Sequence, residues 1–231
     1  MKKDAKSFFD KFSEEYEQQS RYKYLFYKWI IKNVFSEINK PASKIIDMGT
    51  GNGELGIRLA LKFPNASVIG VDISRGMIKQ AQKKVRRIKL RNIAFLVSPI
   101  EKIKIKKSDF VVSSVAFHHV KDKKEVLAKL NSILPRGGKV IIGDYFVPSA
   151  AYKKEVQVLR KKNPTLANKF DKSWKQFLKD MSKDYSGKHP IEYNICPIKL
   201  KEIMIEAGFK NVKIKKCLLP NFSMVVGKKV S

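Results

Sequence analysis

A glycine-rich turn beside a single carboxylate is the part of this 231-residue chain best suited to hold a charged ligand. Asp47 follows a short apolar run, and three glycines follow it at alternate positions: Gly49, Gly51 and Gly53. Without Cβ atoms the backbone can bend sharply and a ligand can lie against it, while the helix that follows points its free N–H groups at that ligand. A carboxylate here would repel a pyrophosphate, so the turn favours a ligand with a positive charge at this point.

The pattern D-x-G-x-G-x-G resembles the first motif of class I S-adenosylmethionine-dependent methyltransferases. In that family the turn packs under the methionine and ribose parts of the cofactor, and the acid helps to hold the aminoacyl end. The resemblance assigns these residues to the cofactor: Asp47, Gly49, Thr50, Gly51, Asn52 and Gly53. Residues 51–56 also fit the G-x-G-x-x-G pattern of dinucleotide-binding folds, which leaves an NAD-dependent oxidoreductase as an alternative.

Asp72 ends a second apolar run, residues 66–73, which reads as a buried parallel strand. An acid roughly 20 residues after a glycine turn binds the ribose hydroxyls in nucleotide-binding α/β folds. The alternative role of Asp72 is to cap the next helix, but Ser74 can do that. We therefore predict that Asp72 accepts hydrogen bonds from the ribose, with Ile73 and Met77 beside it in the cofactor site.

Later segments strengthen the resemblance. Residues 108–120 resemble the fourth strand of the family, written loosely as FD-V-V-S-x-x-x-HH. Residues 127–142 resemble its L-x-PGG-x-L-x-I passage, with Arg136 inserted after the proline. Residues 9–16 are similar to the FD-x-x-A-x-x-Y lead-in of the small-molecule branch that includes the quinone C-methyltransferases. In that branch, the residue at the position that matches Tyr16 often reaches the cofactor.

Methyl transfer is an in-line displacement, so the protein mainly aligns donor and acceptor and sometimes removes a proton. Ligands gather beyond the carboxyl ends of strands in open α/β sheets, and four polar residues follow or end the predicted strand 109–117: Ser113, Ser114, His118 and His119. We expect both serines at the cofactor and a histidine as proton acceptor. His119 is preferred because His118 could pack backward; the alternative is that both only orient the loop. Tyr16 is a third catalytic candidate.

The segment after the third strand departs from the family pattern. The family often carries an acidic residue near the adenine amine, and Pro99 stands in that place. We therefore predict that the adenine is held by the backbone of Ile100 and by the side chain of Ser98 or Glu101.

The net charge of +28 raises the question of nucleic acid. Only 8 of the 49 basic residues are arginine, and lysines occur in every segment. Arginine is the better residue for phosphate recognition, because its planar guanidinium group can donate two hydrogen bonds to one phosphate. The densest basic stretch, residues 79–107, contains Glu101 as its only acid. A solvated helix face is the favoured interpretation, and a docking patch for tRNA or rRNA is the alternative.

The remaining features suggest a cytoplasmic protein. No apolar stretch approaches the ~20 residues that span a membrane, and the first residues lack the apolar block of a secretory signal. Cys196 and Cys217 do not form a metal-ligand spacing and read as reduced thiols. No metal site is predicted.

Apolar runs and helical patterns alternate along the chain, which predicts an α/β fold: a Rossmann-like seven-stranded sheet, mostly parallel with the last strand antiparallel, and helices on both faces. Strands are expected at 44–49, 66–73, 93–98, 109–117, 139–146, 211–219 and 222–229. Helices are expected at 54–63, 75–88, 122–134, 150–162, 171–184 and 198–207. Residues 1–40 form an N-terminal helical cap, 41–147 and 196–231 the core, and 148–195 a helical lid over the acceptor pocket.

Together these features predict a methyltransferase that uses S-adenosyl-L-methionine and leaves S-adenosyl-L-homocysteine. The expected acceptor is a small molecule. An RNA methyltransferase is the first alternative, and a non-catalytic scaffold with this fold or an NAD-dependent oxidoreductase is less favoured. The sequence leaves open the acceptor, the methylated atom and the oligomeric state.

Overall fold

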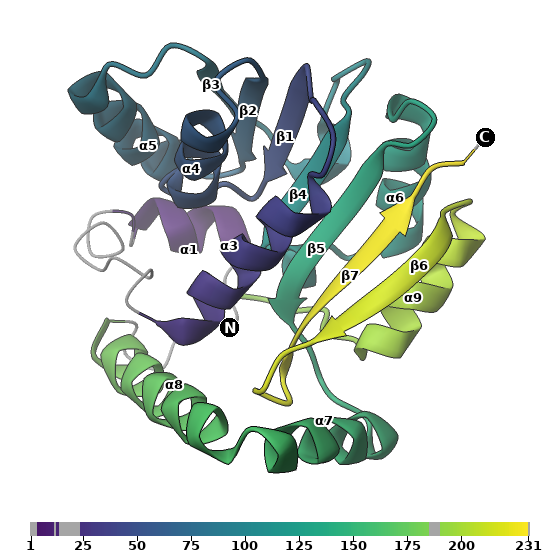
Figure 1. The fold of residues 1–231 in the computed structure, drawn as a ribbon. Coiled ribbons are helices and arrows are strands. Elements are labelled where there is room, and N and C mark those ends of the chain that lie inside the picture. Colours follow the sequence, from purple (N-terminus) through teal and green to yellow (C-terminus); the bar gives the residue numbers. More distant parts are fainter. Residues whose placement is uncertain (1–3, 12, 14–23, 185–189, 231) are drawn as a thin grey trace.

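The computed structural model describes residues 4–11, 13, 24–184 and 190–230, and they contain one seven-stranded sheet (Figure 1). Its strands are β1 Lys44–Met48, β2 Ser67–Asp72, β3 Ile93–Val97, β4 Phe110–Ser114, β5 Lys139–Tyr145, β6 Lys210–Lys216 and β7 Phe222–Lys228. They lie in the order β3-β2-β1-β4-β5-β7-β6, and β7 alone runs against the others. The predicted fold class, with its antiparallel last strand, is confirmed.

Helices cover both faces of the sheet. They are α1 Ala5–Lys11, α3 Leu25–Glu37, α4 Glu54–Lys62, α5 Arg75–Ile88, α6 Lys123–Ile133, α7 Ala150–Lys162, α8 Pro164–Asp184 and α9 Pro197–Glu206, with short 3-10 turns η2 Ile100–Lys102 and η3 Phe117–His119. The buried strands alternate their side chains between two cores. Ile45 packs with residues of α3 and α4, whereas its neighbour Ile46 packs with residues of α6 and α9.

Two element boundaries differ from the prediction for backbone reasons. The strand predicted at 109–117 ends at Ser114, because Val115 has a φ of +53° and turns the chain into η3. A helix predicted from residue 171 begins already at Pro164. Proline fits the first turn of a helix, where its missing N–H has no partner to lose.

The first helix is tied to the beginning of α5. Asp10 Oδ1 accepts hydrogen bonds from Ser74 Oγ at 2.7 Å and from the backbone N–H of Gly76 at 3.0 Å. Ser74 also caps α5 itself, as predicted, by accepting from the backbone N–H of Met77 at 3.1 Å. A carboxylate is stabilised at a helix N-terminus, so Asp10 fixes where α1 lies.

The aromatic residues of the insert mainly pack into the core. Phe26 of α3 contacts Trp174 and Phe177 of α8 edge-on, with ring centroids 5.8 and 5.1 Å away, and Trp174 also meets Phe222. No helix among the described residues is long and apolar enough to cross a membrane. Two other ring-bearing residues of the insert, Tyr185 and His189, lie outside the described residues.

Candidate active site

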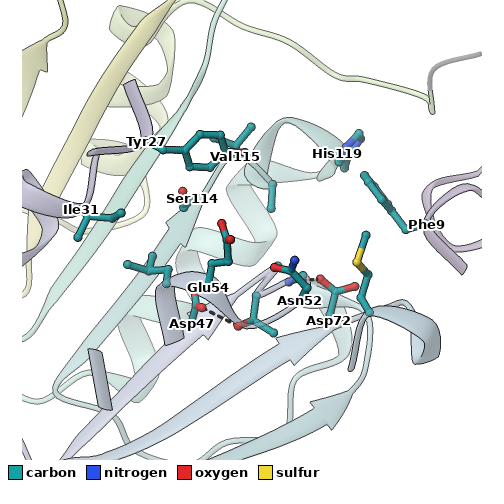
Figure 2. Close-up of a pocket in the computed structure, with 16 residues that line it drawn as sticks. Phe9, Tyr27, Ile31, Asp47, Asn52, Glu54, Asp72, Ser114, Val115 and His119 are labelled. Atoms are coloured by element: carbon teal, nitrogen blue, oxygen red, sulfur yellow. Dashed lines mark hydrogen bonds between the residues drawn. The ribbon is translucent and has the colours of Figure 1, made fainter. Parts of the chain in front are cut away.

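A pocket opens where β1 and β4 lie side by side at their carboxyl ends. The chain goes from β1 to β2 in one direction and from β4 to β5 in the other, so this is the point where the strand order reverses. Open α/β sheets bind their ligands at such a switch point. The pocket encloses about 650 Å³, part of it open to solvent. Figure 2 shows its labelled side chains, which come from β1 and the turn after it, the beginning of α4, the end of β2, the end of β4 with the segment that follows, and helices α1 and α3.

The glycine turn is held down by the neighbouring strand. The backbone N–H groups of Gly49 and Thr50 both donate to the carbonyl of Val71, at 2.8 and 3.0 Å. Gly49 has a φ of +66°, and a Cβ there would lie 2.2 Å from Cβ of Ala116, so no larger residue fits. At Gly51, with a φ of +54°, a Cβ would meet nothing within 4 Å, which leaves room for a ligand to lie against the backbone.

Asp72 joins the turn to the pocket. Its Oδ2 accepts from the backbone N–H of Gly51 at 2.8 Å, and its Oδ1 from that of Ser74 at 2.9 Å. Each carboxylate oxygen can accept a second hydrogen bond. Burial raises the pKa of Asp72, whose residue is 8% exposed. The carboxylate is therefore fixed in position and has acceptor capacity left for the two hydroxyls of a ribose.

Asp47 lies beneath the turn with one oxygen unpaired. Its Oδ2 accepts from Thr50 Oγ1 at 2.6 Å, while Oδ1 is buried without a hydrogen-bond partner among the described residues. The residue is 1% exposed, and burial raises its pKa to about 7, which the hydrogen bond from Thr50 opposes only in part. A buried carboxylate in this state is stabilised by a cationic ligand.

This pKa makes cation binding depend on pH. If a cationic cofactor binds the ionised form of Asp47, its affinity should rise about tenfold from pH 6 to pH 8, as the carboxyl group loses its proton. Calorimetric titration with S-adenosylmethionine across this range measures the effect. Asp47→Asn should bind more weakly and show a flat profile.

The stability of the free protein should change in the opposite sense. The native state keeps the Asp47 proton up to a higher pH than the unfolded chain, so this group lowers stability as pH rises from about 4 to about 7. Asp47→Asn should remove that slope. An equal pH dependence of affinity in both proteins would remove Asp47 from the cation site.

His118 faces away from the pocket and is paired with a buried acid. Asp144 Oδ1 lies 2.7 Å from Nδ1 of His118, and Oδ2 accepts from the backbone N–H of the same residue at 2.9 Å. Burial disfavours the charged ring, but Asp144 outweighs it and raises the pKa of His118. The ion pair fixes η3 against the end of β5, so the expectation that His118 packs backward agrees with its position.

Removing the charge of Asp144 should weaken this anchor. Asp144→Asn should lower the pKa of His118, reduce stability by about 1–3 kcal/mol at pH 6, and lower turnover more than cofactor affinity. The pair stabilises the fold fully below pH about 6.5, and this contribution is lost as pH rises through the raised pKa of His118. NMR titration of the ring protons measures the shift. An unchanged His118 pKa would contradict the pairing.

His119 is the histidine that lines the pocket. Its Nδ1 lies 2.9 Å from the carbonyl oxygen of Ile191, and a ring nitrogen that faces a carbonyl must carry the proton. This assigns the lone pair to Nε2. Burial and the positive charge of His118, whose ring centroid is 4.0 Å away, lower the pKa of His119 to about 4. His119 is therefore a neutral hydrogen-bond acceptor near neutral pH.

Apolar side chains close the pocket on the side of the N-terminal helices. Phe9 of α1 meets the ring of His119 edge-on, with centroids 5.7 Å apart, as Figure 2 shows. Tyr27 and Ile31 of α3 lie on another wall. The anchoring of α1 by Asp10 thus places Phe9 opposite His119.

The structure brings most predicted site residues to one pocket. The lining contains Asp47, Gly49, Thr50, Gly51, Asn52, Asp72, Met77, Ser114 and His119. Predicted residues outside the lining are Gly53, Ile73, Ser98, Ile100, Glu101, Ser113 and His118. Ser113 is fully buried and donates to the carbonyl of Met48 at 3.0 Å, so its hydroxyl joins two strands instead of facing the pocket. Tyr16 lies outside the described residues.

Several lining residues were not predicted. They are Phe9, Tyr27, Ile31, Glu54, Leu55, Val115 and Ala116. Phe9 belongs to the FD lead-in, so that resemblance could have pointed to it. Val115 is a β-branched residue at a φ of +53°, which is a strained conformation that concentrates at functional sites. Nothing in its sequence context signals that conformation.

The sheet order and the position of the pocket define an α/β protein of the Rossmann-like class. The chain belongs to a family described as a methyltransferase domain, which matches residues 39–188. It is 30% identical over 127 residues to the ubiquinone/menaquinone biosynthesis C-methyltransferase UbiE of Wigglesworthia glossinidia brevipalpis, covering 53% of this chain and 51% of that one. It is 31% identical over 113 residues to malonyl-[acyl-carrier protein] O-methyltransferase 2 of Ilyobacter polytropus, covering 48% and 43%.

The alignments with these two curated relatives span about half of their length. Among solved structures, a SAM-dependent methyltransferase from Aquifex aeolicus shares the fold with a TM-score of 0.60 and 18% identity, over 87% of this chain and 89% of that one. The resemblance stated from the sequence is confirmed at the level of family and fold.

The residues present fit S-adenosylmethionine. The open space at Gly51 can take the cofactor against the backbone, Asp72 can accept from the ribose, and the buried carboxylate of Asp47 can balance a positive charge from beneath the turn. These three features suit a ligand that combines a sugar with a cation. The carboxylate of Asp47 does not suit the pyrophosphate of a dinucleotide.

Proposed function

We propose that this protein transfers a methyl group from S-adenosylmethionine to a small, uncharged acceptor. One observation carries the proposal: the pocket at the switch point is acidic in a strongly basic chain. Three carboxylates line it, from Asp47, Glu54 and Asp72, and the described lining contains no lysine or arginine, although the net charge of the chain is +28. Such a pocket favours a cationic donor and repels anions.

The bound donor would supply a methyl group that its sulfonium already activates. Asp72 would hold the ribose, and Asp47 would balance the positive charge. Phe9, Tyr27 and Ile31 would exclude water from the reacting atoms. Most of the rate enhancement would then come from alignment of donor and acceptor in a closed pocket.

His119 would orient the acceptor. Nε2 is free to accept a hydrogen bond from an O–H, N–H or polarised C–H group, because Nδ1 is committed to Ile191. With a pKa of about 4 the ring is a weak base, so it directs the acceptor's lone pair more than it removes a full proton before transfer. The acceptor itself must be able to lose a proton readily.

The insert at 148–195 would act as a lid on the acceptor side. No lining residue of the described pocket comes from it, but its last residues are bonded to η3: Ile191 through His119, and the backbone N–H of Tyr193 to the carbonyl of His118 at 2.7 Å. Lys123 reinforces this joint by donating to the carbonyls of Val120 and Tyr193. A small-molecule acceptor and a cytoplasmic location are part of this proposal.

RNA remains the main competitor as acceptor. The basic residues of α5 would attract RNA electrostatically. However, an RNA phosphate near the reacting atoms would face the carboxylates of Asp47, Glu54 and Asp72. The acid lining therefore supports the small-molecule acceptor.

Methyl transfer from labelled S-adenosylmethionine into an extract of source cells tests the proposal. The products are separated into metabolite, lipid, RNA and protein fractions, with Asp72→Ala as the inactive control. Label in metabolite or lipid supports the proposal and supplies a compound to identify. Label in RNA would overturn the small-molecule acceptor, and no label in any fraction, with the cofactor bound, would support the scaffold alternative.

A further inference from the structure

A second cavity lies at the opposite edge of the sheet from the cofactor pocket. It encloses about 750 Å³, part of it open to solvent. The end of α3, the beginning of β5, the beginning of β6 and the end of β7 contribute to it, and these meet at the edge of the sheet where β5 begins and β7 ends (Figure 1). We call it the amino-edge pocket. Four of its lining residues are lysines: Lys40, Lys139, Lys213 and Lys228.

A buried carboxylate organises one side of this pocket. Glu37, which is 3% exposed, accepts from Lys213 and Lys215 through Oε1 at 2.8 and 2.6 Å, and from Lys139 through Oε2 at 3.1 Å. Burial opposes ionisation, but the three ammonium groups lower the pKa of Glu37 to about 2. Glu37 is therefore ionised near neutral pH and holds its lysines in place, yet it compensates only one positive charge.

The other side of the pocket carries ammonium groups that no carboxylate neutralises. Among the described residues, neither Lys40 nor Lys228 has a carboxylate oxygen within 4 Å. Both converge on Gly137: a Cβ at that glycine would lie 3.4 Å from Nζ of Lys40 and 3.9 Å from Cε of Lys228. The absence of a side chain at Gly137 keeps this space open.

The polar groups around the cavity are mostly donors. The ammonium group of Lys139 donates hydrogen bonds to the carbonyl oxygen of Glu37, to Glu37 Oε2 and to Oδ1 of Asn39. Because Oδ1 of Asn39 faces Lys139, the amide nitrogen of Asn39 points away from Lys139 and can donate elsewhere. Asn211 adds a second side-chain amide to the lining. An excess of positive charge with several donors and one fully engaged carboxylate matches an anion that has several acceptor oxygens.

We propose that the amino-edge pocket binds a phosphate group, as a free diphosphate or as the phosphate end of a small phosphoester. Lys40, Lys213 and Lys228 contact the phosphate oxygens, and Glu37 keeps Lys213 in position. This site is separate from the cofactor pocket and does not depend on the methyl-transfer reaction. A link between the two exists through α3, whose first turns contribute Tyr27 and Ile31 to the cofactor pocket and whose last residue is Glu37.

Calorimetric titration with inorganic diphosphate at constant ionic strength tests the site. We expect one ligand per chain and at least about tenfold weaker binding in Lys40→Ala/Lys228→Ala, because two charge-assisted contacts are lost. The matched control is Lys79→Ala/Lys83→Ala, which removes two exposed lysines from α5 and changes the net charge equally. Its affinity should equal that of the unaltered protein.

Two further arms identify the source of the phosphate and guard against misfolding. Adenosine diphosphate is titrated in parallel: tighter binding than diphosphate indicates a phosphoester, and equal or weaker binding indicates the free anion. In the unaltered protein, diphosphate should protect Lys40 and Lys228 from acetylation, measured by mass spectrometry, more than Lys79 and Lys83. Three results would overturn the site and assign diphosphate binding to overall charge: equally weakened binding in both double variants, several ligands per chain, or uniform protection of all four lysines. Binding of transfer RNA that is weakened equally in both double variants would have the same meaning.

Discussion

Asp72→Ala is expected to weaken S-adenosylmethionine binding by roughly 10²- to 10⁴-fold, because two hydrogen bonds to a charged acceptor contribute about 1.5–3 kcal/mol each. The carboxylate is already oriented by the backbone N–H groups of Gly51 and Ser74, so the ribose meets a fixed acceptor. Its removal also frees the N–H of Gly51, which lies in the turn that the cofactor covers. Equilibrium titration of the folded variant, checked by circular dichroism, measures the change.

Asp122→Ala is the matched control for this experiment. Asp122 also accepts a backbone N–H through its side chain, from Glu125 at 2.9 Å, but it caps α6 away from the pocket. The Asp122→Ala variant should lose a similar amount of stability from its broken side-chain-to-backbone hydrogen bond, and it should keep its cofactor affinity. If Asp72→Ala binds as well as Asp122→Ala does, Asp72 is a structural residue and the ribose lies elsewhere.

His119→Ala is expected to lower turnover by about 10²-fold while cofactor affinity changes less than about threefold, since a positioned hydrogen-bond acceptor acts on the acceptor molecule and not on the donor. Once the acceptor is identified, single-turnover kinetics separate the two effects. The pH–rate profile should show no loss of activity near pH 6.5 from this ring, because its pKa is about 4.

His119→Asn separates catalysis from tethering. The asparagine amide can still donate to the carbonyl of Ile191, as Nδ1 of the ring does, but it offers nothing in place of Nε2. Turnover that stays low in this variant assigns the effect to Nε2. Turnover restored to the original rate would show that His119 only ties the insert to η3.

The sequence predicted the order of the core elements because their signals are local. Buried parallel strands are short apolar runs, and the helices between them carry their own caps, as Ser74 does for α5. The two wrongly predicted boundaries also have local causes. A helix was expected only from residue 171, although α8 begins at Pro164, and the left-handed backbone of Val115 ended a strand that apolar residues alone would continue.

Pocket residues were expected from the sequence only where they lie in or beside a recognisable motif. The turn after β1 and Asp72 carry a recognisable pattern, and the structure places them at the pocket. Ser113 was assigned by closeness in sequence, but side chains alternate across a strand, so Ser114 reaches the pocket and Ser113 does not. Tyr27 and Ile31 reach it only through the docking of α3, which no short motif encodes.

The insertion of β7 between β5 and β6 has a consequence for biosynthesis. β5 pairs with β7 along all seven of its residues, yet β7 is synthesised after every other strand of the described sheet. Until then the edge of β5, with Val140, Ile141 and Ile142, has no partner on that side, and an open apolar edge is prone to pair with other chains. The strands that build the cofactor pocket are complete well before this point. A nascent chain can therefore assemble its binding turn early, while its resistance to aggregation depends on the later β6–β7 hairpin.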